Sequence, residues 1–298
     1  MIYDCFSFFN ELDLLEIRLN ELHSIVDKFV LVEATRTHQN KTKPLYFSDN
    51  KSRFKQFESK IIHVIVNEYP SFFTKFRKPS SWDIERHQRN QIIQGLKECK
   101  PDDIILVSDM DEIPDPTKIS LFKDRMGLKV FRQKNYYYYV NCVGKQEEEK
   151  WWYGTVMAHF RDFKKPQQLR KVSNKMHAEG LKILENKAYR NLKSITEPIF
   201  KKNISIIDQA GWHFSYLGGA EKIIEKLEAF AHSEFNKSEF KNKNSIQHLI
   251  ESGKDILGRG NDFEFVPLDS SFPDYLTKNQ ERFRELIFDS GLNNNKSK

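Results

Sequence analysis

A group of carboxylates directly follows an apolar run in the stretch ILVSDMDEIPDP, residues 105–116. Asp109, Asp111 and Glu112 are so close in sequence that each would raise the pKa of the others unless a positive charge lay between them. In an extended chain, residues two apart point to the same side, so Asp109 and Asp111 can address one ligand. Carboxylate oxygens suit Mg²⁺ or Mn²⁺ held together with substrate phosphates. We therefore predict a divalent-metal site with Asp109 and Asp111 as ligands.

A simpler interpretation of the same stretch stays open. Asp109 and Asp115 can cap turns, Glu112 can cap a helix, and the remaining carboxylates can be solvated surface. The preceding apolar run argues for a site, because ligands of open α/β sheets bind at the carboxyl ends of strands. Met110, between the two aspartates, is expected to point into the protein.

The surrounding pattern predicts the elements that would hold this motif. Apolar runs indicate four strands, at 2–9, 28–35, 60–66 and 102–109. Amphipathic segments between them indicate helices at 11–26 and 83–100, the second with Ser81 or Asp83 as its N-cap. This alternation is typical of an α/β fold with a mainly parallel central sheet and helices on both faces.

The later part of the chain has a different pattern. Aromatic strands at 128–141 and 150–160, joined by a polar turn, indicate antiparallel additions to the sheet. After them the chain becomes helical, with helices expected at 220–235, 245–256 and 274–289. We predict a single domain over 1–289, with halves 1–115 and 116–289, and a disordered polar tail at 290–298.

Composition limits the class of protein. The net charge of +6 favours anionic partners such as nucleotide diphosphates, while no helix-turn-helix or RNP-type sequence indicates nucleic-acid binding. Cys5, Cys99 and Cys142 lack metal-type spacing and fit a reducing compartment. The first apolar stretch lacks the basic start of a signal peptide, and no apolar window reaches about 18 residues. We expect a cytoplasmic protein, with peripheral contact to a membrane surface left open.

Several motifs together resemble glycosyltransferase family 17. They are SDMDEIP at 108–114, AGWHFSY at 210–216, FNELDLLEIRL at 9–19 with FVLVEA at 29–34, and shorter pieces near 43, 89 and 274. The resemblance implies a GT-A-like nucleotide-diphospho-sugar transferase fold. It further implies metal-dependent, inverting transfer of a sugar, N-acetylglucosamine in that family, from a UDP-sugar to a glycan, polysaccharide or glycoprotein. On this reading Asp111 coordinates Mn²⁺ or Mg²⁺, and Asp109 contacts ribose or a metal-bound water.

The resemblance extends to further site residues. It suggests His213 as another metal ligand and Trp212 as part of the sugar pocket, although a core histidine and ordinary packing are the alternatives. Arg89 and Asn90 match the family on the predicted 83–100 helix, where arginine can pair with phosphate. From position alone, Glu33 at a strand end could read base or ribose, and Lys43, or Lys41, could meet phosphate unless this loop is merely solvated.

An inverting transfer needs a base, which is usually Asp or Glu. The candidates are Asp208, Asp162 and Glu179, and the sequence does not choose among them. One side of the YYYY run at 136–139 is expected to be buried and the other to face acceptor. The glycine-rich segment 252–265 could close over the donor with Arg259 reaching the diphosphate, or it could be a connector.

Two other classes of function share these features. Nucleotidyl transfer or phosphoester hydrolysis also uses paired carboxylates and Mg²⁺, although no P-loop is present. A non-catalytic nucleotide-sugar-binding module would keep the fold without turnover. Binding of UDP-sugars with and without Mn²⁺, followed by a search for released UDP, separates the three.

Overall fold

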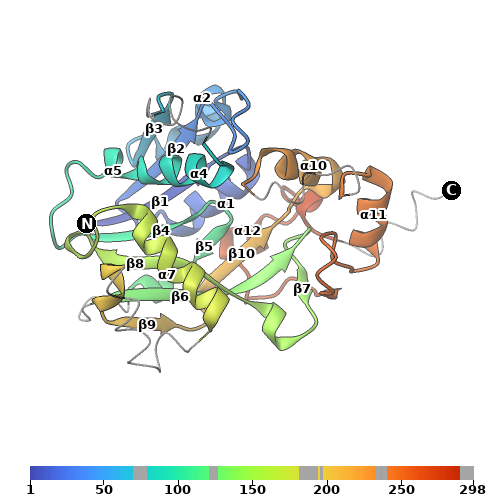
Figure 1. The fold of residues 1–298 in the computed structure, drawn as a ribbon. Helices are drawn as coiled ribbons and strands as arrows, with labels where there is room; N and C mark the ends of the chain where they lie inside the picture. The colour runs from blue at the N-terminus through green and yellow to red at the C-terminus, as the bar shows by residue number, and fades with distance from the viewer. Residues whose placement is uncertain are drawn as a thin grey trace.

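The computed structural model describes residues 1–69, 79–120, 127–180, 194, 197–231, 236 and 240–288 (Figure 1). Four parallel strands form one half of a mixed sheet, in the order β3 (Ile61–Val66), β2 (Lys28–Ala34), β1 (Ile2–Phe8) and β4 (Ile104–Asp109). In the register of the central pair, Ser7 of β1 lies opposite Asp109 of β4. The carboxylate motif therefore begins at the carboxyl end of a buried parallel strand, as predicted.

The other half of the sheet contains the predicted antiparallel additions. Strand β8 (Trp151–His159) lies between β4 and β6 (Leu128–Tyr137) and is antiparallel to both. Beyond β6 follow the short antiparallel strands β7 (Cys142–Gly144) and β11 (Phe263–Phe265). Strands β9 (Ile204–Ile207) and β10 (Gly211–Ser215) run parallel to β6, and β5 (Glu112–Pro114) is antiparallel to β10.

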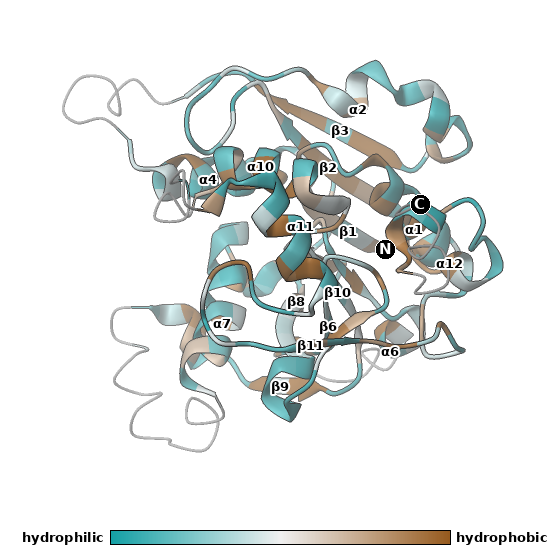
Figure 2. Cartoon of the chain, turned by 90° about the vertical axis from the view of Figure 1, so that its right-hand side faces the viewer, coloured by the Kyte–Doolittle hydropathy of each residue, from teal (hydrophilic) through white to brown (hydrophobic). Residues whose placement is uncertain are grey.

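Helices cover both faces of this sheet. Helices α1 (Leu12–Leu22) and α12 (Asp274–Lys278) pack on the face that carries Phe6 and Leu106. Helices α5 (Ile92–Gly95) and α7 (Pro166–Glu179) pack on the opposite face, which carries Cys5 and Val107. Neighbouring strand residues thus enter different cores, as the two-residue period of a strand requires. In Figure 2 the strands β2 and β3 are largely brown, and of the two only β2 is buried on both faces, because β3 is at the edge of the sheet.

Further elements surround this frame. Helix α4 (Ser81–Asn90) lies near the face of the sheet on which α5 packs. Helices α10 (Gly219–Ala229) and α11 (Lys243–Glu251) form a third core with Tyr138 and Phe263. Short helices complete the described part, namely α2 (Tyr46–Asp49), α6 (Pro116–Ile119), η1 (Lys51–Phe57), η3 (Glu147–Lys150), η4 (Phe160–Asp162), η5 (Pro198–Lys201) and η8 (Arg284–Leu286).

The predicted helix 83–100 differs from the structure at both ends. Its N-cap is Ser80, not Ser81 or Asp83, and Asp83 is the reciprocal partner in a capping box with Ser80. The helix ends at Asn90, and α5 follows after Gln91 as a separate short helix. The observed arrangement places Arg89 in the last turn of α4.

Other predicted boundaries were also too long. Strand β6 ends at Tyr137 because Tyr138 adopts a left-handed φ of 67°, and the predicted polar turn after it contains β7. Helix α10 ends at Ala229, α11 at Glu251 and α12 at Lys278. The predicted tail at 290–298 lies outside the described residues. None of the helices in the described ranges is both long and apolar enough to cross a membrane.

Candidate active site

A pocket of about 440 Å³ opens where β1 and β4 end. Its walls include Ser7 of β1 and the segment 109–111, which begins with the last residue of β4, together with side chains of helices α4, α7 and α10. Six cationic side chains line it: Arg36, Lys43, Arg89, Arg170, Lys226 and Arg259. The carboxylates in the lining are Glu11, Glu85, Asp109 and Asp111. Cations of three helices therefore converge on the two aspartates of the sequence motif.

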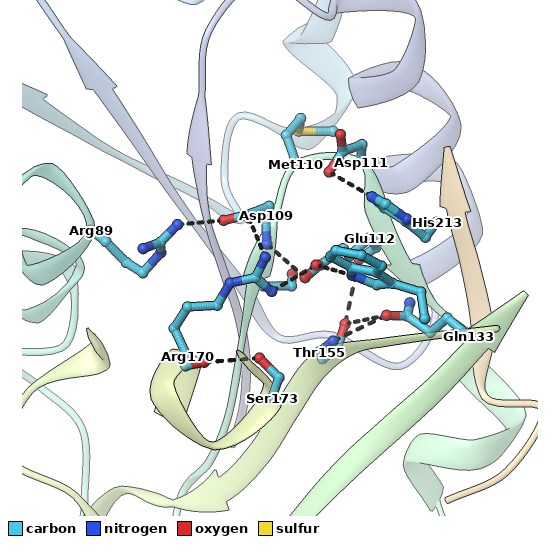
Figure 3. Close-up of polar contacts among 12 residues, drawn as sticks. Arg89, Asp109, Met110, Asp111, Glu112, Gln133, Thr155, Arg170, Ser173 and His213 are labelled. Carbon is cyan, nitrogen blue, oxygen red and sulfur yellow. Dashed lines mark hydrogen bonds and ion pairs between the residues drawn. The ribbon is translucent and has the colours of Figure 1, made fainter. Parts of the chain in front are cut away.

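Asp109 is held by two guanidinium groups. Arg89 donates to its Oδ1 at 2.8 Å and Arg170 donates to its Oδ2 at 2.6 Å (Figure 3). Burial raises the pKa of Asp109, but the charges of Arg170 and Arg89 outweigh burial and bring this pKa below its usual range. The positive charge that the sequence requires beside Asp109 is thus supplied by arginines, which hold Asp109 as an anion.

Glu112 ties the same network to the sheet. Its Oε1 accepts hydrogen bonds from Arg170 at 2.6 Å and from the indole of Trp152 at 2.7 Å. Its Oε2 accepts from the backbone nitrogen of Asp109 at 3.0 Å. Burial raises the pKa of Glu112, with the charge of Arg170 acting in the opposite direction. Glu112 begins strand β5, so it does not cap a helix.

Asp111 lies between a lysine and a histidine. Lys226 donates to its Oδ2 at 2.8 Å, while its Oδ1 lies 3.8 Å from Nε2 of His213 (Figure 3 shows the second pair). Nδ1 of His213 is 2.8 Å from Oδ1 of Asn135, and the amide nitrogen of Asn135 donates to the carbonyl of Glu149. This arrangement makes His213 Nδ1 the donor, so the lone pair of Nε2 faces Asp111. Burial lowers the pKa of His213 to about 4, which keeps the ring neutral.

These donors fit part of the predicted metal site. A neutral imidazole nitrogen and a carboxylate oxygen 3.8 Å apart can share one Mn²⁺ ion, with substrate phosphates supplying further oxygens. Asp109 accepts one hydrogen bond from an arginine at each of its two oxygens. Across the ranges that the structure describes, no three His, Cys, Asp or Glu side chains gather closely enough to hold a metal by themselves.

An aromatic ring connects this centre to α7. The ring of Trp152 stacks on His213 with centroids 4.4 Å apart, and it contacts the ring of His177 with centroids 4.2 Å apart. All three rings line the pocket. Burial lowers the pKa of His177, and the charges of Arg170 and Arg259 lower it further. Trp152 therefore fixes the orientation of two neutral imidazoles at once.

A buried arginine beneath the pocket holds the loop that carries the two aspartates. Nη1 of Arg18 donates to the carbonyl oxygens of Asp109, Met110 and Glu112 at 3.0 to 3.1 Å. The side chain of Met110 is buried in the core, as predicted. The loop is therefore anchored from below through its backbone, while its carboxylates point into the pocket.

Two of the predicted donor-binding residues besides Asp109 and Arg89 also line the pocket. Lys43 does so, with its ammonium 5.5 Å from the ring centre of Phe9 and 4.0 Å from Glu33. Burial lowers the pKa of Lys43, with Glu33 acting against it. Arg259 also lines the pocket, where it forms an ion pair with Asp255.

Other predicted binding residues have structural contacts instead. Glu33 is buried and accepts from the backbone of Phe47 and Ser48, which lie in α2, and contacts His63. Asn90 accepts from the backbone of Gln167 and so joins α4 to α7. Glu33, Asn90 and Trp212 are not among the residues that line the pocket. Trp212 packs in the core and donates to the carbonyl of Ser271.

The carboxylates predicted as base candidates are not among the residues that line the pocket. Asp208 pairs with Arg132, Asp162 with Lys202, and Glu179 with Lys175. Among the tyrosines, Tyr136 and Tyr138 are fully buried, while Tyr137 lines the pocket. The side of the strand that carries Tyr137 is therefore the one that faces the pocket.

Sequence reasoning missed the residues that complete the charge network. Arg170 lies on α7, a helix that the polar segment 166–179 did not reveal. Lys226 is one of several lysines in an amphipathic helix, and its only sequence signal is its place on the apolar face. Trp152 lies in the predicted aromatic strand at 150–160, and the sequence does not distinguish it from the other aromatic residues there.

Comparison with known proteins places the chain among sugar-transferring enzymes. The model of glycosyltransferase family 17 matches residues 1–181. The β-1,4-mannosyl-glycoprotein 4-β-N-acetylglucosaminyltransferases of rat and human are each 25% identical over 313 residues, covering 93% of this chain and 53% of the relative. The chain thus spans about half the length of these curated relatives.

Solved structures are similar only distantly. A Mycobacterium tuberculosis glucosyl-3-phosphoglycerate synthase, solved with Mn²⁺ and UDP-glucose, is 12% identical with a TM-score of 0.34 and covers 72% of this chain and 71% of its own. A galactosyltransferase solved with donor and acceptor sugar analogues is 15% identical with a TM-score of 0.34, covering 69% and 72%. Similarity at this level carries no argument about the site.

Proposed function

This chain belongs to glycosyltransferase family 17, and on that premise we propose that it transfers a sugar from a UDP-sugar to a hydroxyl of a glycan, polysaccharide or glycoprotein. The donor sugar proposed is N-acetylglucosamine, which the curated relatives transfer according to their names. The observation that carries the proposal is the position of Asp111. This carboxylate lies at the end of β4 in a pocket with six cationic side chains.

The charge of the pocket suits a nucleoside diphosphate. Arg89 and Arg170 keep Asp109 ionised, and a carboxylate fixed in this way accepts hydrogen bonds from ribose hydroxyls without taking a proton. Lys43 and Arg259 approach from other walls of the same pocket. Their charges compensate the diphosphate both in the donor and as it leaves.

Asp111 and His213 are the residues that would hold the divalent cation. A cation bound there would act as a Lewis acid that stabilises the charge of the leaving diphosphate. The chain's own contribution is to keep His213 neutral and oriented, through the hydrogen bond to Asn135 and the stack on Trp152. Asn135→Ala should therefore weaken Mn²⁺-dependent UDP binding while Asp111 stays in place.

The experiment is a donor screen with product analysis. Purified protein is incubated with a panel of UDP-sugars and candidate acceptors, with Mn²⁺ or with EDTA, and released UDP is measured alongside the mass of the acceptor. The proposal predicts UDP release and an acceptor heavier by one sugar, both lost in EDTA. Release of a sugar 1-phosphate would instead indicate nucleotidyl transfer, or phosphoester cleavage if UMP appears with it, and UDP-sugar binding without any product would indicate a binding module.

A further inference from the structure

Helix α10 carries a lysine on its buried face. Ala220, Ile223 and Leu227 face the third core at helical spacing, and Lys226 lies on this side of the helix with 9% of its surface exposed. Lys222 of the same helix is exposed and bonds Glu225. Burying an ammonium group is costly unless it is paired, so the position of Lys226 needs a specific reason.

The contacts of Lys226 leave part of its ammonium available to a ligand. It donates to Oδ2 of Asp111 at 2.8 Å, which is its single side-chain hydrogen bond within the described residues. The ring centres of Phe230 and Tyr216 lie 4.7 and 5.4 Å away and cannot accept a strong hydrogen bond. Because an ammonium has three donors and this one lines the pocket, it can bind a second anion beside Asp111.

We propose that Lys226 is a donor-binding residue that contacts the diphosphate directly. In the free protein its charge is compensated by Asp111, and in the complex it is shared with a phosphate oxygen. This inference rests on the proposed function, because it assumes that a nucleoside diphosphate enters this pocket. It also implies that Lys226 and a divalent cation compete for Asp111, so that the free protein binds the cation more weakly than the diphosphate complex does.

The first test measures binding rather than turnover. UDP and inorganic pyrophosphate are titrated calorimetrically into wild type, Lys226→Met, Lys226→Arg and the control Lys222→Met, all in EDTA. Losing one hydrogen bond to a charged group should weaken binding by roughly tenfold or more in Lys226→Met. Lys226→Arg should keep most of the affinity, and Lys222→Met should match wild type.

The second test uses the competition for Asp111. Mn²⁺ is titrated into the protein without nucleotide, and the free ion is measured by its electron paramagnetic resonance signal. Lys226→Met should bind Mn²⁺ more tightly than wild type. Asp111→Asn should bind UDP in EDTA at least as tightly as wild type, since Lys226 is then released. Should Lys226→Met fail to fold, the pair Asp111→Asn and Asp111→Asn/Lys226→Met replaces it, because neither leaves a buried carboxylate unpaired.

The outcomes separate the two proposals. Equal UDP affinity of wild type and Lys226→Met in EDTA, or of the replacement pair, would overturn the role of Lys226 and leave the transferase proposal intact. Binding of pyrophosphate but no uridine nucleotide would refute the UDP donor, and the pyrophosphate titration would still decide on Lys226. A wild type that binds neither, with or without Mn²⁺, would refute both.

Discussion

Arg18 and Asp4 form an ion pair in which neither side chain is exposed. Nη2 of Arg18 lies 2.6 Å from Oδ1 of Asp4, and Nε lies 2.8 Å from Oδ2. The remaining amino group of Arg18 donates to the backbone carbonyls of Asp109, Met110 and Glu112. A residue of α1 and a residue of β1 thus hold the loop of the active-site aspartates from within the core.

Arg18→Met should therefore destabilise the protein strongly. It leaves the carboxylate of Asp4 buried without its partner, which costs on the order of 3–5 kcal/mol. Chemical denaturation measures this loss as a change in the free energy of unfolding. The double variant Asp4→Asn/Arg18→Met should recover part of it, and a loss below about 1 kcal/mol in the single variant would show that the pair does not hold the loop.

Adjacent residues of α7 offer a matched comparison. Arg170 is buried and pairs with Asp109 and Glu112, whereas Lys171 is exposed and pairs with Glu197. Arg170→Met should lower the free energy of unfolding by several kcal/mol, because it leaves the buried Glu112 without its arginine and Asp109 with Arg89 alone. Lys171→Met should change it by less than about 0.5 kcal/mol. Both variants are compared with wild type by thermal and chemical unfolding. Equal losses of stability in Arg170→Met and Lys171→Met would contradict the assignment of Arg170.

His177 predicts a dependence of stability on pH. In the folded protein, burial lowers the pKa of His177, and the charges of Arg170 and Arg259 lower it further. In the unfolded chain the imidazole takes up its proton at about pH 6.5. The unfolded state therefore binds more protons just below this pH, and the contribution of His177 to stability is lost as the pH falls.

The comparison with His177→Asn isolates this contribution. Denaturation of both proteins from about pH 8 down to about pH 5 should show wild type losing more stability than the variant, with a constant difference above about pH 7.5. A difference that stays the same across the whole range would mean that the folded protein does not lower the pKa of His177.

The segment 252–265 is predicted to become ordered when donor binds. Gly253, Gly258 and Gly260 have left-handed φ values of 66°, 68° and 85°, and Arg259 between them reaches the pocket. Hydrogen exchange across this segment should slow only when UDP and Mn²⁺ are both present. Identical exchange in both states, with normal UDP affinity in Arg259→Ala, would make the segment a connector.

Part of this account could be read from the sequence. The strand ending at Asp109 was predictable because it is a continuous apolar run buried on both faces, and the spacing of Asp109 and Asp111 fixed their common direction. His213 was found through its motif. These features are local, since each is encoded within a few residues.

The partners of the carboxylates could not be read in this way. Arg170 reaches Asp109 and Glu112 from 61 and 58 positions away, and Lys226 reaches Asp111 across 115 positions. Nothing in a polar helix such as α7 distinguishes a lysine or arginine that will pair inside from one that stays in solvent. The guanidinium partners of Asp109 were therefore not predicted, and the metal site with Asp109 and Asp111 as ligands stays a prediction.

The most direct test of the central claim compares two aspartates of one strand region. UDP release from the preferred UDP-sugar in the presence of Mn²⁺ and acceptor is measured for wild type, Asp111→Asn and the control Asp102→Asn. Asp102 precedes β4 at its other end, and 78% of its side chain is exposed. The account predicts a loss on the order of a hundredfold or more in Asp111→Asn and wild-type rates in Asp102→Asn. Undiminished UDP release by a folded Asp111→Asn protein would contradict sugar transfer at this site.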